Sequence, residues 1–138
     1  MVLGFSTTNK KTREATNFVD LILDGRKIHS IREGDRWKES MAIQMATGVR
    51  TKSQQVFNAD RDDLSTCKGV QSIEINTKGG EFRGIEYTIT IDGRKLSERE
   101  AKQLATNDGF SSLYEFLTWF QTGKITGQII HWTDLKYL

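Results

Sequence analysis

The sequence predicts an α+β fold: a mostly antiparallel sheet that closes into a small β-barrel, with about three flanking helices. From residue 73 to residue 91, apolar side chains alternate with polar ones, which is typical of strands with one buried face. Along the chain, one helical segment is followed by several strand segments, two more helical segments and a last strand. This grouping favours an antiparallel sheet over alternating βαβ units. Closure into a barrel would remove the exposed edges of such short strands.

The first helix is expected over residues 16–24, where apolar side chains recur at helical spacing. Thr16 can cap its start, and Gly25 is suited to the position just past its end. The octet that follows, residues 25–32 (GRKIHSIR), has β-branched residues among polar ones and no helix cap of its own. We therefore expect this octet to be extended.

The remaining strands are predicted from short apolar or alternating segments. A turn over residues 33–38 precedes a buried strand at 41–46 and a short strand at 55–57. A long hairpin follows between residues 67 and 92, with its turn at Lys78-Gly79-Gly80. The last strand is expected over residues 125–132.

Two helices are expected between the hairpin and the last strand. Ser97 and Glu100 have the spacing of a capping box at the start of a helix over residues 97–107. Ser112 and Glu115 repeat this spacing ahead of a third helix, whose apolar residues form one stripe that should face the core.

Length and composition limit the class of protein. The 138 residues suit one domain over 1–138, and 36% hydrophobic with 28% charged residues is a globular composition. Cys67 is the only cysteine, so no internal disulfide forms, and its spacing to the two histidines does not indicate a metal site. No apolar run approaches the ~20 residues that cross a bilayer. We expect a cytoplasmic protein with no metal, no cofactor and no membrane partner.

Basic residues are concentrated in the first half of the chain. The net charge is only +2, but residues 10–52 contain ten basic and six acidic side chains. In the octet, Arg26, Lys27 and Arg32 surround His29 and Ser30, a composition that suits a polar or anionic ligand. A solvated mixed surface is the alternative.

Side chains alternate faces along an extended segment. Regular alternation would place Lys27 and Ser30 on opposite faces, so they can share one face only across a bulge or bend. We interpret His29 as a packing or surface residue rather than a ligand or a base.

Two further segments are candidates for ligand contact. Arg50, Thr51 and Lys52 lie in a stretch with a glycine and hydroxyl side chains, which suits phosphate contact, although a charged hairpin loop is the more common explanation of such a stretch. Trp37, between two basic residues, could stack on a base, as in single-strand binders, or pack in the core.

The octet resembles the G-x-K-x-x-T-I-R signature that follows the first helix of ASCH domains, a family similar to the PUA RNA-binding fold. Further similarity covers most of the chain, at Arg36-Trp37-Lys38, residues 47–52, Asp108-Gly109-Phe110 and Ile130-His131-Trp132. The resemblance implies a PUA-like barrel with a cleft beside the first helix and a role linked to RNA.

Some ASCH proteins are amidohydrolases of acetylated cytidine that use a Lys, a Thr and a Glu. By resemblance, Lys27 stands at the Lys position, Ser30 at the Thr position, and Asp108, with one inserted residue, near the Glu. Independently, a hydroxyl nucleophile needs a nearby base, and a lysine serves if burial or a neighbouring cation lowers its pKa. Arg26 and Arg32 could supply that charge.

Three functions follow. The first is binding of RNA or a nucleotide in a cleft lined by Lys27, Ser30, Arg32, Arg50, Lys52 and Asp108. The second is hydrolysis of an acyl group from a modified nucleoside such as acetylcytidine, with Lys27, Ser30 and Asp108 as catalytic residues. The third is interaction with a protein partner, for which Tyr114 and Trp119 lie off the core stripe of their helix.

Overall fold

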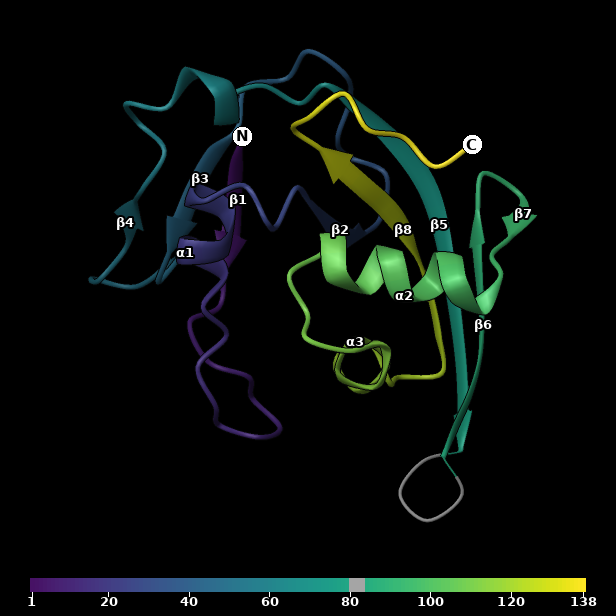
Figure 1. Cartoon of the computed structure of the whole chain (residues 1–138). Coiled ribbons are helices and arrows are strands. Elements are labelled where there is room, and N and C mark those ends of the chain that lie inside the picture. Colours follow the sequence, from purple (N-terminus) through teal and green to yellow (C-terminus); the bar gives the residue numbers. More distant parts are fainter. Residues whose placement is uncertain (80–83) are drawn as a thin grey trace.

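The computed structural model describes residues 1–79 and 84–138, which form an α+β fold with mostly antiparallel strand pairing (Figure 1). The described strands are β1 (Val2–Phe5), β2 (His29–Glu33), β3 (Gln44–Thr47), β4 (Gln55–Val56), β5 (Gly69–Gly79), β6 (Ile85–Ile91), β7 (Arg94–Lys95) and β8 (Lys124–His131). The helices are α1 (Phe18–Leu23), α2 (Glu98–Asn107) and α3 (Leu113–Trp119), with a short 3-10 helix, η1 (Asp62–Leu64).

The described strands form two sheets. One has the order β1-β3-β4 and contains a parallel pair, β1 with β3; the other has the order β2-β8-β5-β6-β7 and is antiparallel throughout. In Figure 1, α2 and α3 lie over one face of the larger sheet, and α1 lies beside the smaller sheet. The predicted closed barrel is not found in the described part of the chain, because no hydrogen-bonded ladder joins the two sheets.

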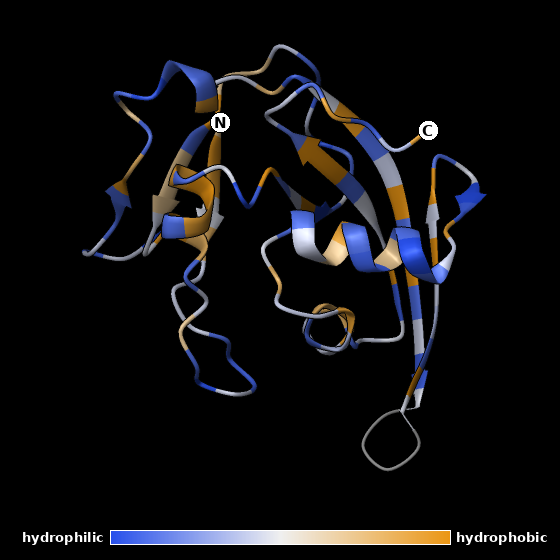
Figure 2. Cartoon of the chain, in the orientation of Figure 1, coloured by the Kyte–Doolittle hydropathy of each residue, from blue (hydrophilic) through white to orange (hydrophobic). Residues whose placement is uncertain are grey.

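The long hairpin and the last strand form the centre of the larger sheet. β5 pairs with β6 from Ile73↔Ile91 to Gly79↔Ile85, and with β8 along its other edge. Figure 2 shows hydrophobic and hydrophilic residues alternating along β5 and β8, as expected for strands that bury one face. The predicted turn Lys78-Gly79-Gly80 lies partly outside the described residues.

The two C-terminal helices begin where their caps predict. Ser97 Oγ accepts from the Glu100 amide at 3.2 Å and the Glu100 carboxylate accepts from the Ser97 amide at 3.1 Å, which is the complete capping box. Ser112 Oγ likewise accepts from the Glu115 amide, at 3.1 Å. The apolar sides of both helices are buried against the sheet, at Ala101, Leu104, Ala105, Phe116 and Leu117.

Three details of the N-terminal half differ from the prediction. β1 was not expected, and it forms because Leu3 and Phe5 are buried where the strand pairs with β3. The first helix is shorter than predicted. Its N-cap residue is Asn17, in the left-handed region at φ 59°, and not Thr16. In place of the strand expected at 41–46, the strand β3 begins at Gln44 and ends at Thr47.

Candidate functional site

A cavity of about 150 Å³ lies where the two sheets, α1 and the α2–α3 region meet. Five polar residues line it: Ser6, Lys27, Ser30, Arg32 and Asp108. Its other lining residues are mostly aromatic and include Phe5, Phe18, Phe110, Trp119 and Phe120. The cavity therefore brings together the three predicted catalytic residues and one predicted ligand-binding residue.

Lys27 reaches the cavity because it precedes strand β2. Gly25 ends α1 in the left-handed region at φ +87°, and the amides of Arg26 and Lys27 both donate to the Leu21 carbonyl at 2.9 Å. β2 begins only at His29, so strand alternation does not extend back to Lys27. This bend explains how Lys27 and Ser30 line the same cavity.

Asp108 is fixed by the end of α2. It is the C-cap residue, and the following amides of Gly109 and Phe110 donate to the Thr106 and Ala105 carbonyls at 3.0 Å, the pattern of a Schellman motif. Gly109 has φ +91°, and a Cβ there would lie 2.9 Å from Lys27 Cδ. A glycine is therefore needed both for the backbone conformation and for the close approach of Lys27.

Lys27 and Asp108 form a buried ion pair. Lys27 Nζ donates to the Asp108 carbonyl oxygen at 2.5 Å and to Oδ1 at 3.1 Å, and both residues are 2% exposed. The carbonyl is at the negative end of the α2 dipole, which also favours a cation there. Lys27 Nζ also lies 4.7 Å from the centroid of the Phe18 ring.

Burial changes the pKa of both partners. Burial, reinforced by the Arg32 charge and opposed by Asp108, lowers the pKa of Lys27 from 10.5 to about 8. Burial raises the pKa of Asp108, but the Lys27 charge and the His29 hydrogen bond outweigh it, so this pKa lies below its ordinary value. At neutral pH the pair is therefore ionised, with a lysine that can lose its proton under mildly basic conditions.

His29 holds Asp108 from the other side. It is fully buried; Nδ1 lies 3.1 Å from Asp108 Oδ1 and Nε2 lies 2.6 Å from Tyr137 Oη. Asn107 Nδ2 donates to Tyr137 Oη at 3.0 Å, so the tyrosine hydroxyl can donate to His29 Nε2 while Nδ1–H donates to Asp108. Burial lowers the pKa of His29, which favours this neutral form.

The contact of His29 with Asp108 was missed from the sequence. The two hydrogen-bond partners of His29, Asp108 and Tyr137, lie 79 and 108 residues further along the chain. A lone histidine in an extended segment gives no signal of such distant partners.

Arg32 fixes Ser30. Arg32 Nη1 donates to Ser30 Oγ at 2.7 Å, Nη2 donates to the Gly4 carbonyl, and Cζ lies 5.2 Å from the Phe5 ring centroid. Burial, opposed by Asp108, lowers the pKa of Arg32. Because Ser30 Oγ accepts from Arg32, its own proton remains available to the cavity. Within the described residues Ser30 and Lys27 share the cavity without a direct hydrogen bond.

The other predicted ligand-binding residues do not line this cavity. The exposed Arg26 pairs with Asp24 at 2.6 Å, and Trp37 is 4% exposed with its backbone held by the Gln128 side chain. Arg50, Thr51 and Lys52 lie on the exposed loop after β3, where Thr51 Oγ1 donates to the Gly48 carbonyl at 2.6 Å. Arg26, Arg50 and Lys52 point to solvent from separate loops. The cavity is therefore not part of the broad basic surface that the sequence suggested.

The aromatic residue Trp119 belongs to the cavity wall. Its ring packs edge-to-face on Phe18 and Phe110, at 5.5 and 5.6 Å between centroids. Tyr114, the other residue off the core stripe of α3, is 63% exposed.

Within residues 1–79 and 84–138, no group of three or more His, Cys, Asp or Glu side chains is arranged to hold a metal ion. Nor does this part of the chain contain a helix with the length and apolarity to cross a membrane. Comparison with protein-family models, with curated proteins and with solved structures gave no match to this chain.

Proposed function

We propose that the protein binds a nucleotide, either free or within RNA, by taking one base into the cavity lined by Lys27, Ser30, Arg32 and Asp108. The observation that carries this proposal is the combination of buried hydrogen-bonding groups with aromatic walls in one small cavity. Aromatic rings offer stacking surface to any base. Buried donors and acceptors select the edge of the base.

The size of the cavity supports a single ring system. Its volume of about 150 Å³ is below the ~300–1,000 Å³ of pockets that enclose whole drug-sized ligands. In this proposal Ser30 and Asp108 contact the polar edge of the base, and Lys27 and Arg32 provide positive charge.

The ASCH resemblance, and with it a PUA-like relationship, is part of the proposal. Lys27, Ser30 and Asp108 are the positions that the resemblance implies as working residues. Their presence around one cavity supports it.

Binding is tested by calorimetric titration with cytidine, cytidine monophosphate and a single-stranded RNA of mixed sequence. Lys27→Ala and Arg32→Ala should weaken binding at least about tenfold, since a hydrogen bond to a charged group contributes ~1.5–3 kcal/mol. Arg26→Ala is the matched control, because Arg26 is an exposed cation of the same octet outside the cavity. The proposal is rejected if none of the four bases binds as a nucleoside, as a nucleoside monophosphate or within a single-stranded RNA.

A second candidate, hydrolysis of an N-acylated nucleoside, is favoured by one observation: a lysine with a pKa of about 8 shares the cavity with a serine hydroxyl. In this reaction Ser30 Oγ attacks the acyl carbonyl and its proton passes to the neutral Lys27 amine, directly or through a water. The Arg32 guanidinium stabilises the negative charge that develops. Lys27 then protonates the leaving amine, and water hydrolyses the acyl-serine ester.

Acetylcytidine is the probe for this reaction, with release of cytidine as the readout. Activity should rise with pH through about 8, as Lys27 loses its proton, and Ser30→Ala should abolish it. Ser30→Thr keeps a hydroxyl and should retain activity. If the Ser30→Ala and Lys27→Met variants both still release cytidine, the roles of Ser30 as nucleophile and Lys27 as base are rejected.

A further inference from the structure

The C-terminal tail, residues 133–138, reaches the buried site through Tyr137. The tail contains no helix or strand, and the Gln71 side chain of β5 holds it. Gln71 Nε2 donates to the Tyr137 carbonyl at 2.6 Å, and Gln71 Oε1 accepts from the Tyr137 amide at 2.8 Å. The Tyr137 ring packs on the rings of His29 and His131, at 5.6 and 6.0 Å between centroids. Gln71 therefore fixes the tail where the Tyr137 hydroxyl reaches His29.

The hydrogen bonds between Tyr137 and Asp108 have one consistent direction. Because Asp108 is ionised, the His29 nitrogen that faces it, Nδ1, carries the ring proton. His29 Nε2 is then an acceptor, and the Tyr137 hydroxyl, at 2.6 Å, is its donor. Burial raises the pKa of Tyr137, so the hydroxyl keeps its proton. Asn107 Nδ2 donates to the same hydroxyl oxygen at 3.0 Å. The chain of donors therefore runs from Asn107 through Tyr137 and His29 to Asp108.

This chain decides which oxygen of Asp108 is left for a ligand. Oδ1 accepts from both Lys27 Nζ and His29 Nδ1, at 3.1 Å each. Oδ2 has no hydrogen-bond partner within residues 1–79 and 84–138. It is nevertheless not enclosed, since His131 Nδ1 is the one enclosed side-chain atom without a partner in that part of the chain. Oδ2 is therefore open to the cavity that Asp108 lines. Without His29, Lys27 alone would hold Oδ1, and the carboxylate could turn.

We propose that Tyr137 is a positioning residue of the site. It fixes the His29 ring, which holds Asp108 Oδ1 and leaves Oδ2 to accept a hydrogen bond from an amino group or ring N–H of the bound base. This inference rests on the proposed base-binding function. Neither Tyr137 nor His29 lines the cavity, so their effect on binding passes through Asp108.

The first test needs no ligand. NMR of the imidazole rings in the full chain should show the His29 proton on Nδ1. Tyr137→Phe should move this proton's resonance upfield, because loss of the donor at Nε2 weakens the hydrogen bond from Nδ1 to Asp108. A proton on Nε2, or a resonance that Tyr137→Phe does not move, would overturn the proposal.

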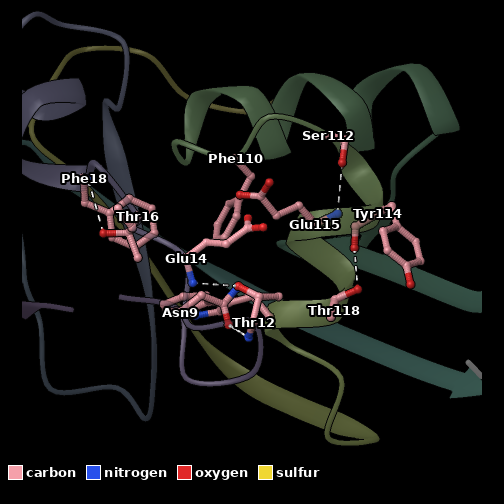
Figure 3. A pocket seen from close by; sticks show the side chains of 12 residues that line it. Asn9, Thr12, Glu14, Thr16, Phe18, Phe110, Ser112, Tyr114, Glu115 and Thr118 are labelled. Carbon is pink, nitrogen blue, oxygen red and sulfur yellow. Dashed lines mark hydrogen bonds between the residues drawn. The ribbon is translucent and has the colours of Figure 1, made fainter. Parts of the chain in front are cut away.

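Tyr114→Phe is the matched control, because it removes the same hydroxyl from a tyrosine that is 63% exposed. In Figure 3, the hydrogen bond at Tyr114 runs from the Thr118 hydroxyl to the Tyr114 backbone oxygen, and the Tyr114 hydroxyl is not bonded to the residues drawn. This variant should leave the His29 resonance where it is in the wild type.

The second test is a double-mutant cycle on affinity, measured by calorimetry with cytidine, uridine, adenosine and guanosine. Tyr137→Phe should weaken the tightest of these complexes about threefold to tenfold, as expected for one lost hydrogen bond. His29→Asn places an amide nitrogen where Nδ1 was, so it can still donate to Asp108 and should keep most of the affinity. His29→Leu removes a hydrogen bond to a charged group and should weaken binding at least about tenfold. In the His29→Asn background, Tyr137→Phe should have no further effect.

Three results of the cycle would overturn the proposal. One is wild-type affinity in Tyr137→Phe. Another is a loss from Tyr137→Phe that persists in the His29→Asn background, because Tyr137 would then act by packing alone. The third is an equal loss in His29→Asn and His29→Leu, a comparison that does not depend on the folding of a Tyr137 variant. If none of the four nucleosides binds to the wild type, the base-binding function itself is rejected, and the imidazole spectra still decide whether the hydrogen-bond chain exists.

Discussion

The burial of Lys27 predicts an unusual dependence of stability on alkaline pH. In the unfolded chain its pKa is the ordinary 10.5, and in the folded protein burial, only partly opposed by Asp108, holds its pKa at about 8. Between these two values the unfolded chain binds more protons than the folded protein. The free energy of unfolding therefore rises with pH across this window.

The size of the effect follows from the two pKa values. At ~1.4 kcal/mol for each pKa unit, the difference between about 8 and 10.5 corresponds to about 3 kcal/mol. Substitution of Lys27 by methionine removes this titration and keeps a side chain of similar length. The difference in unfolding free energy, wild type minus Lys27→Met, should increase by about 3 kcal/mol from pH 7.5 to 10.5.

Urea denaturation at a series of pH values, followed by tryptophan fluorescence, measures this difference, because Trp37 and Trp132 are buried. Lys52→Met is the control, since Lys52 is an exposed lysine on the loop after β3. Its unfolding free energy should follow that of the wild type across the range. A wild-type minus Lys27→Met difference that is flat or falls with pH would refute the reasoning.

Three further substitutions test the packing around the site by urea denaturation. Gly127→Ala should destabilise the fold by about 3 kcal/mol, because its Cβ would lie 2.2 Å from the Arg32 carbonyl oxygen across β2 and β8; an unchanged midpoint would contradict this contact. Gly109→Ala should cost about 1–3 kcal/mol, from its positive φ and its approach to Lys27, and should weaken nucleoside binding as well. Ser97→Ala should cost about 1 kcal/mol through loss of the α2 cap, with nucleoside affinity unaltered.

The sequence predicted those parts of the fold that depend on neighbouring residues. Alternation of apolar residues found the β5–β6 hairpin, and the pairs Ser97–Glu100 and Ser112–Glu115 located the starts of α2 and α3. These signals are local because a strand face, a helix stripe and an N-cap are each decided within a few residues. The α+β class with mostly antiparallel sheets followed from the order of those elements.

Tertiary structure decided which side chains meet. Lys27 and Asp108 are 81 positions apart, and they pair because the end of α1 and the end of α2 converge. The same convergence buries His29 against Asp108 and Tyr137, while Arg26, one residue before Lys27, points to solvent. The sequence by itself determined that a basic octet follows the first helix. Which of its residues enter the cavity was decided by the bend at Gly25 and by long-range packing, since local pattern carries no information on contacts between distant segments.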